Sequence, residues 1–202
     1  AQRWKPRHWF QPLANLALAA GFQYGVGSHD LEIGKYTHGA MPKAEFKARV
    51  RRFFSKTGKQ WFKDYLLFPA LALWSAPRVL AGNFCANLIR NLWTYVVIFC
   101  GHFTEGVAIY REEDTRNETN LTGGRLFHIM TGHLSHQIEH HLFPDMPAHR
   151  YVEVAPQIQA LCKKYGLFYN TGSLWRQYLT VMKRILTHTL PPKATPAMPS
   201  AR

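Results

Sequence analysis

The sequence predicts an all-α protein that is inserted in a membrane and carries amphipathic helices on its surface. Three observations predict this class. Residues 10–28 contain no formal charge, residues 66–103 carry only Arg78 and Arg90 as charged residues, and residues 41–63 combine basic and aromatic side chains at helical spacing. With 47% hydrophobic and only 18% charged residues, the composition excludes a disordered, collagenous or coiled-coil chain.

The length and the cysteines bound the organisation of the chain. The 202 residues support one domain, which we place at 1–190 and follow with a disordered tail at 191–202. The three cysteines lie far apart and form no CxxC pair, so neither a disulfide framework nor a cysteine zinc site is predicted. A reducing compartment is the expectation that follows.

Residues 10–28 form the first predicted membrane segment. They follow a basic and aromatic stretch, and their 19 residues are long enough to cross a bilayer core of about 30 Å as a helix. Gln11, Asn15 and Gln23 leave open the alternative of a buried helix in a soluble protein.

Residues 41–63 form a predicted basic amphipathic helix. They contain eight basic residues and one acidic residue, with Phe46, Val50, Phe53 and Phe54 at helical spacing. Nucleic-acid binding is the alternative for such a charged run. The basic residues flank apolar segments, and this arrangement favours a membrane surface over a nucleic acid.

Residues 66–103 predict a helical hairpin in the membrane. Ser75–Arg78 is a plausible turn between its two arms. Arg90 would then have to face protein or polar headgroups. A polar loop at 111–125 follows, then a helix from Tyr151 to Tyr165 that ends at Gly166. Thr171 or Ser173 could cap a last helix, which has Leu174, Tyr178, Val181, Met182, Ile185 and Leu186 on one face.

The histidines between His133 and His149 predict a metal-binding cluster. On a helix, Gln137, His140 and His141 share one face, and His133 and His136 extend this face by one turn. Imidazole suits Fe, Zn, Cu and Ni alike, and Glu139 does not stand where the zinc hydrolase motif HExxH places its glutamate. The alternative is a polar helix with solvated histidines.

The text QIEHHLFP, followed by MPAHRY, resembles the third histidine box of the membrane fatty acid desaturases. The resemblance extends from Trp4 to Tyr169, includes DYLLFPAL, ANLIRNLW and VIFCGHF, and is closest to bacterial acyl desaturases of the stearoyl type. It implies a multi-pass membrane protein with a histidine-rich helical cap on its cytoplasmic face. There, two irons would use O2 to introduce a double bond into an acyl chain.

The resemblance also implies roles for single residues. Gln137, His140 and His141 match the box, and His102 matches an isolated metal ligand after the last membrane helix. His136 can replace Gln137 as a ligand, because neutral imidazole binds iron better. His133 and Glu139 are expected to orient a ligand ring rather than bind metal, and we expect no catalytic residue besides the metal ligands.

Partners follow from the same resemblance. The substrate is expected to be a fatty acyl chain carried as acyl-CoA or acyl-lipid, and the electron donor a ferredoxin or a cytochrome b5-like protein. The basic residues between Lys47 and Lys63 could dock an acidic carrier or an acyl-CoA phosphate. The lipid bilayer is the expected surroundings, and no nucleic acid is expected as a partner.

Two motifs that the resemblance leads us to expect do not occur in this sequence. The desaturase family carries earlier boxes HxxxH and HxxHH, and neither occurs between Ala1 and Phe103. We therefore expect the chain to be the C-terminal part of a longer enzyme and to hold iron weakly by itself. Two alternatives are an inactive truncated membrane remnant and a related membrane di-iron hydroxylase.

Overall fold

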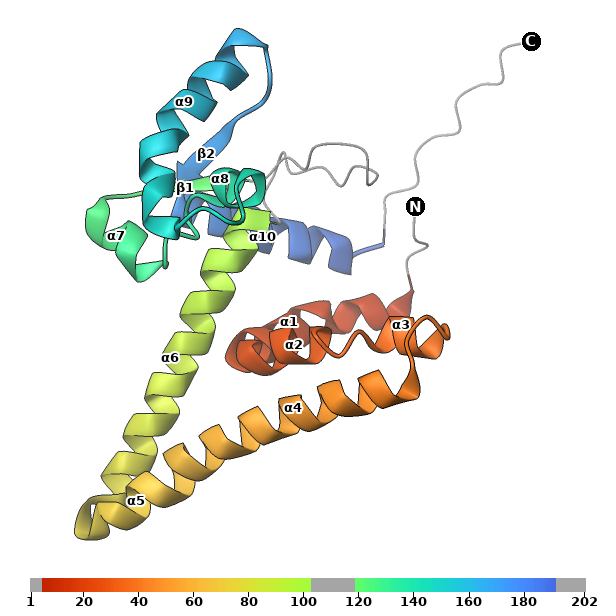
Figure 1. Cartoon of the computed structure of the whole chain (residues 1–202), viewed down its shortest axis with the longest axis vertical. Coiled ribbons are helices and arrows are strands. Elements are labelled where there is room, and N and C mark those ends of the chain that lie inside the picture. The colour runs from red at the N-terminus through yellow and green to blue at the C-terminus, as the bar shows by residue number, and fades with distance from the viewer. Residues whose placement is uncertain (1–4, 103–118, 192–202) are drawn as a thin grey trace. The chain divides into compact units, whose positions relative to one another are not determined.

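The computed structural model describes residues 5–102 and 119–191, and these residues are mostly helical (Figure 1). The expected tail from residue 192 onward lies outside the described residues. The chain divides into two compact units. One is Ala17–Tyr95, and the other combines Ala1–Leu16 with Val96–Arg202, so the boundaries fall inside two helices.

The first unit consists of helices joined by short turns. Its core includes Phe22 and Tyr95, whose rings meet edge to face at 5.7 Å between centroids. Its elements, including the shared helices α1 and α6, are α1 (Gln11–Ala20), α2 (Phe22–His29), α3 (Ile33–Thr37), α4 (Lys43–Phe62), α5 (Phe68–Leu71) and α6 (Ala76–His102).

The prediction of one membrane-length helix over 10–28 is wrong. Gly21 has φ −110° and ψ 29°, which is not helical, and it separates α1 from α2. The two helices have 10 and 8 residues, whereas a crossing needs about 20. The segment is uncharged, but Gly21 interrupts the helix because glycine has little preference for helical backbone.

The predicted basic amphipathic helix is confirmed as α4. Its apolar side packs on α2, where the Phe53 ring lies so close to Gly27 that a Cβ there would be 2.7 Å from the ring. Trp61 Nε1 donates a hydrogen bond of 2.6 Å to the hydroxyl of Tyr24. Two aromatic side chains of α4 therefore join it to α2, one against a glycine and one against a tyrosine.

The predicted turn of the hairpin lies close to its expected place. α4 continues through a π-helical turn (Lys63–Leu67) and α5, and the chain reverses through Leu73–Ser75 before α6 begins. Asn83 of α6 donates to the carbonyl of Asp64 at 2.6 Å, which fastens α6 to the preceding arm. Arg90 donates to the side chain of Gln23, so this intramembrane candidate charge has a protein partner.

One helical stretch in the described part of the chain, Leu73–His102, is long and apolar enough to cross a membrane. Only 28% of its apolar window is buried inside the structure. Phe84 and Ile89 are 59% and 67% exposed, as suits side chains that face lipid. We expected several membrane crossings, and the described residues contain one candidate helix for such a crossing.

The second unit contains two short strands that the all-α prediction missed. Thr119, expected in a polar loop, is fully buried and pairs with Asn170 in a parallel register. The polar composition of both segments conceals the pairing. The elements after α6 are β1 (Thr119–Thr122), α7 (Arg125–Met130), α8 (Gln137–Leu142), α9 (Tyr151–Lys164), β2 (Asn170–Ser173) and α10 (Leu174–Thr189).

The last two helices agree with the prediction. α9 ends before Gly166, whose φ of 66° is a backbone conformation that favours glycine. α10 begins after Ser173, which stands at the N-cap position, although no side-chain hydrogen bond caps the helix. Thr171 lies within β2 rather than at the cap.

Candidate functional site

The histidine motif folds as the short helix α8, which lies beside the end of α6 and the strands β1 and β2 (Figure 1). α8 begins after His136 and ends at Leu142, before Pro144. The helical spacing places Gln137, His140 and His141 on one face and Glu139 on the opposite face. We call these the histidine face and the glutamate face of α8.

The histidine face contacts the end of α6 through His102. Gln137 Nε2 lies 2.8 Å from His102 Nε2, and the rings of His102 and His141 are 5.5 Å apart between centroids. The rings of His140 and His141 are 5.2 Å apart. Four predicted ligands from two distant parts of the sequence are therefore gathered in one place.

Gly101 allows this close approach. A Cβ at Gly101 would lie 2.9 Å from Cγ of Gln137, closer than real Cβ contacts come. The glycine therefore leaves room for the Gln137 side chain against α6. The sequence motif predicted a role for His102 but none for Gly101.

Tyr151 orients the ring of His140. Its hydroxyl lies 3.2 Å from His140 Nδ1 and donates to the carbonyl of Phe143 at 3.3 Å. Because the carbonyl only accepts, both contacts are satisfied when His140 carries its proton on Nδ1. Nε2 of His140 then holds the free lone pair that a metal needs.

The donor set fits iron chemically but does not form a complete site in the described part of the chain. Imidazole nitrogens are suitable ligands for iron, and Gln137 Oε1 is buried with no hydrogen-bond partner in the part of the chain that the structure describes. Among residues 5–102 and 119–191, however, no three His, Cys, Asp or Glu side chains are arranged to hold one metal ion. The described donors are therefore gathered in one place without surrounding a common metal position.

The glutamate face is tied into the fold by a buried carboxylate. Glu139 is fully buried and accepts hydrogen bonds from Asn120 Nδ2 at 2.7 Å and from the Tyr169 hydroxyl at 2.8 Å. Asn120 Oδ1 in turn accepts from the backbone N–H of Ile138 at 2.9 Å. Burial, and then the bond to Glu139, raise the pKa of Tyr169 above its ordinary range.

His136 belongs with the glutamate face and not with the histidine face. Its ring stacks on that of His128 at 4.6 Å between centroids, and Nδ1 lies 3.8 Å from Glu139 Oε2. Burial lowers the pKa of His136, which keeps the ring neutral. Both ring nitrogens are buried without a hydrogen-bond partner among the described residues.

The expected stripe of histidines along one helix is wrong. His133 has φ 60°, in the left-handed region, and stands in the turn between α7 and α8. His136 precedes the helix at its N-cap. The prediction failed because the helical period was extended through a segment whose backbone turns before Gln137.

Sequence reasoning missed three residues that hold the site: Asn120, Tyr151 and Tyr169. Asn120 and Tyr169 lie 19 and 30 positions from Glu139, and the side chains give no periodic signal that joins them. Tyr151 ends the stretch MPAHRY, which the resemblance already singled out. This stretch was the one signal in the sequence that could have pointed to Tyr151.

Comparisons with known proteins agree on one family. The model of the fatty acid desaturases matches residues 2–173. The chain is 39% identical to the NADPH-dependent stearoyl-CoA 9-desaturase of Mycobacterium tuberculosis, over 95% of this chain and 49% of that protein. It is 50% identical to fatty acid desaturase 3 of Bos taurus over 66% of this chain and 28% of that protein.

A more distant relative is the acyl-lipid 8-desaturase of Rebecca salina, 32% identical over 48% of this chain and 25% of that protein. The chain spans about half the length of the mycobacterial relatives that it matches almost throughout. No solved structure matches the chain.

Proposed function

Because the chain belongs to the fatty acid desaturase family, we propose that it supplies part of the iron-binding residues of an O2-dependent acyl desaturase. The observation that carries this proposal is the convergence of His102, Gln137, His140 and His141 at the histidine face. The proposal takes the substrate to be an acyl chain, carried as acyl-CoA or acyl-lipid.

Each side chain has a defined task in this proposal. His102, His140 and His141 would bind iron through ring nitrogens, with Gln137 as a further ligand. His136, which the sequence offered as an alternative to Gln137, lies with the glutamate face beside His128 and Glu139. Iron, when bound with ligands that complete the site, supplies the oxidising power for removing two hydrogens from the acyl chain. Tyr151 holds the His140 ring in the orientation and tautomer that ligation needs.

The surroundings of the site support a membrane substrate. The apolar stretch Leu73–His102 ends at the candidate ligand His102, which places that ligand at the end of the candidate membrane helix. We propose that the site faces the cytoplasm, where a ferredoxin or a cytochrome b5-like protein would deliver electrons. Glu139 and His133 are proposed to support the ligands without binding iron.

Substitution of His140 tests the proposal in the protein that carries this segment. His140→Ala should reduce desaturation of a supplied acyl substrate by more than about 100-fold and lower the iron content per chain. Membrane insertion should stay intact, because the side chain is only half-buried. The matched control is His38→Ala, an exposed histidine outside the site, which should keep full activity.

Retained activity in His140→Ala would contradict the ligand assignment. A second candidate, a membrane protein that binds no iron, is favoured by the incomplete ligand group among the described residues. Iron analysis of the unsubstituted protein separates the two functions. Two irons per chain support the desaturase, and none supports the protein without iron.

A further inference from the structure

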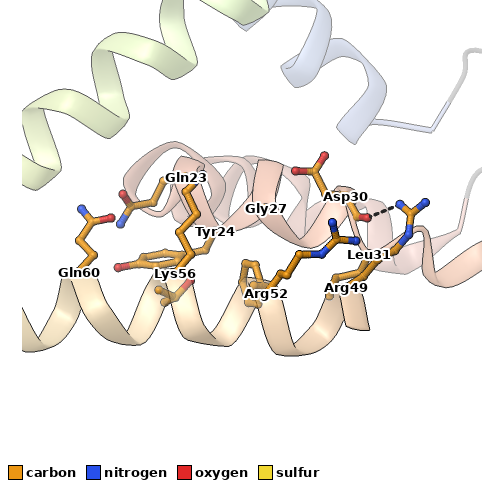
Figure 2. A pocket seen from close by; sticks show the side chains of 11 residues that line it. Gln23, Tyr24, Gly27, Asp30, Leu31, Arg49, Arg52, Lys56 and Gln60 are labelled. Carbon is orange, nitrogen blue, oxygen red and sulfur yellow. Dashed lines mark hydrogen bonds between the residues drawn. The ribbon is translucent and has the colours of Figure 1, made fainter. Parts of the chain in front are cut away.

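A pocket of about 540 Å³ lies between α2 and α4 in the unit Ala17–Tyr95 (Figure 2). Its volume is in the range of small-molecule sites, about 300–1,000 Å³. α4 contributes Arg49, Arg52, Lys56 and Gln60 to its wall. The proposed desaturase chemistry uses none of these residues.

The pocket is formed by the fold without a ligand. At one end, Arg49 donates to the carbonyl of Asp30 at 3.0 Å. At the other end, Trp61 donates to Tyr24, as described above. The contact of Phe53 with Gly27 forms the floor between them. Because α2 and α4 are joined at several points, a ligand would meet a preformed site, and ordering that site on binding would cost little free energy.

The positive charge in the pocket belongs to Arg52 and Lys56. Arg49 is neutralised by ion pairs with Glu45 at 2.8 Å and Glu32 at 3.3 Å. Within the described residues, by contrast, no ion pair or hydrogen bond joins the side chain of Arg52 or Lys56 to another group. Asp30 is the acidic residue in the pocket wall, and Figure 2 shows its carboxylate directed away from α4.

The spacing of these cations favours a bound anion. Arg52, Lys56 and Gln60 are four positions apart along α4, so they form one row, and Figure 2 shows them pointing toward α2. Like charges at this spacing repel each other and destabilise a helix. An anion held by both side chains removes this repulsion.

We propose that this pocket binds the phosphate groups of a ligand through Arg52 and Lys56, with Gln60 as a neutral donor at its end. The guanidinium group presents paired N–H donors to phosphate oxygens, and the ammonium group adds a point charge. Phosphates can come from a soluble ester, such as the coenzyme A part of an acyl-CoA, or from a phospholipid headgroup.

Pyrophosphate binding tests the proposal on the detergent-solubilised full chain by isothermal titration calorimetry in about 0.15 M salt, which screens diffuse attraction. We expect saturable binding that weakens at least tenfold in Arg52→Gln/Lys56→Gln. The matched control is Lys47→Gln/Arg51→Gln, which removes the same charge from exposed positions of α4 that do not line the pocket.

Two outcomes would overturn the proposal: no saturable binding, or equal weakening in both double variants, which would indicate diffuse attraction to a basic helix. Competition then distinguishes the two sources. Displacement of pyrophosphate by coenzyme A supports a soluble ester, and displacement by phosphatidylglycerol vesicles, but not phosphatidylcholine vesicles, supports a headgroup. Because no turnover is measured, failure of the desaturase proposal would leave this result unaffected.

Discussion

The two faces of α8 differ in what their side chains contact. On the glutamate face, Glu139 is fully buried and receives two charged hydrogen bonds from side chains on other segments. On the histidine face, His141 is exposed and His140 half-buried, and the ring of His141 contacts the rings of both His102 and His140. Neighbouring residues of one short motif therefore perform different tasks.

The difference separates fold stability from chemistry. A buried carboxylate with good donors is costly to disturb, because removing it leaves buried polar groups without partners. Partly exposed imidazoles contribute little to folding and remain available for a ligand. The glutamate face thus fixes α8, and under the proposed function it holds the histidine face in position for a metal.

The largest effect on stability is expected for Glu139→Ala. The loss of the carboxylate leaves Asn120 and Tyr169 without their shared acceptor in a buried site. We expect the free energy of unfolding in detergent to fall by about 2–6 kcal/mol, because each buried donor left without an acceptor costs about 1–3 kcal/mol. His141→Ala, on the exposed side of the same helix, should cost less than about 0.5 kcal/mol. Equal losses in the two variants would refute the division between the faces.

A smaller effect is expected for Tyr169→Phe, which removes one donor to Glu139 and should cost about 1.5–3 kcal/mol. The hydroxyl also gives a pH dependence. Because folding raises the pKa of Tyr169, the unfolded chain releases this proton first, and the stability contribution is complete below about pH 10 and lost as the pH rises further.

Denaturant unfolding between about pH 9 and 11 checks this sign. The unsubstituted chain should lose stability over this interval more steeply than Tyr169→Phe. Parallel slopes for the two proteins would mean that the tyrosine does not titrate differently in the folded state.

The smallest expected effect comes from the approach of α8 to α6. Gly101→Ala places a Cβ against Gln137 and should cost about 1–2 kcal/mol through overpacking. Gly82→Ala is the matched control on the same helix, because nothing lies within 4 Å of its added Cβ. That variant should gain about 0.5–1 kcal/mol from helix propensity. A similar gain in both variants, measured by thermal unfolding, would show that Gln137 does not press on α6.

Sequence patterns predicted helices where a period is carried by many residues, as in α4, α9 and α10. They failed where one residue breaks the period, as at Gly21, or where a turn precedes a motif, as at His133. At the site, the shared face of Gln137, His140 and His141 on α8 was predictable from spacing. Their supports were not, because a pairing of distant segments brings Asn120 and Tyr169 to Glu139, and no local pattern records it.

The parallel pairing of β1 with β2 also sets an order of events during synthesis. Thr119 and Asn170 are 51 positions apart, and the histidine motif lies between them. At about 5–20 residues per second, the ribosome completes Gln137–Leu142 seconds before it adds Asn170. Contacts between distant positions form late, because loop closure must precede them. Glu139 therefore cannot accept its hydrogen bond from Tyr169 until the ribosome has added 30 further residues, so α8 gains this support only late in synthesis.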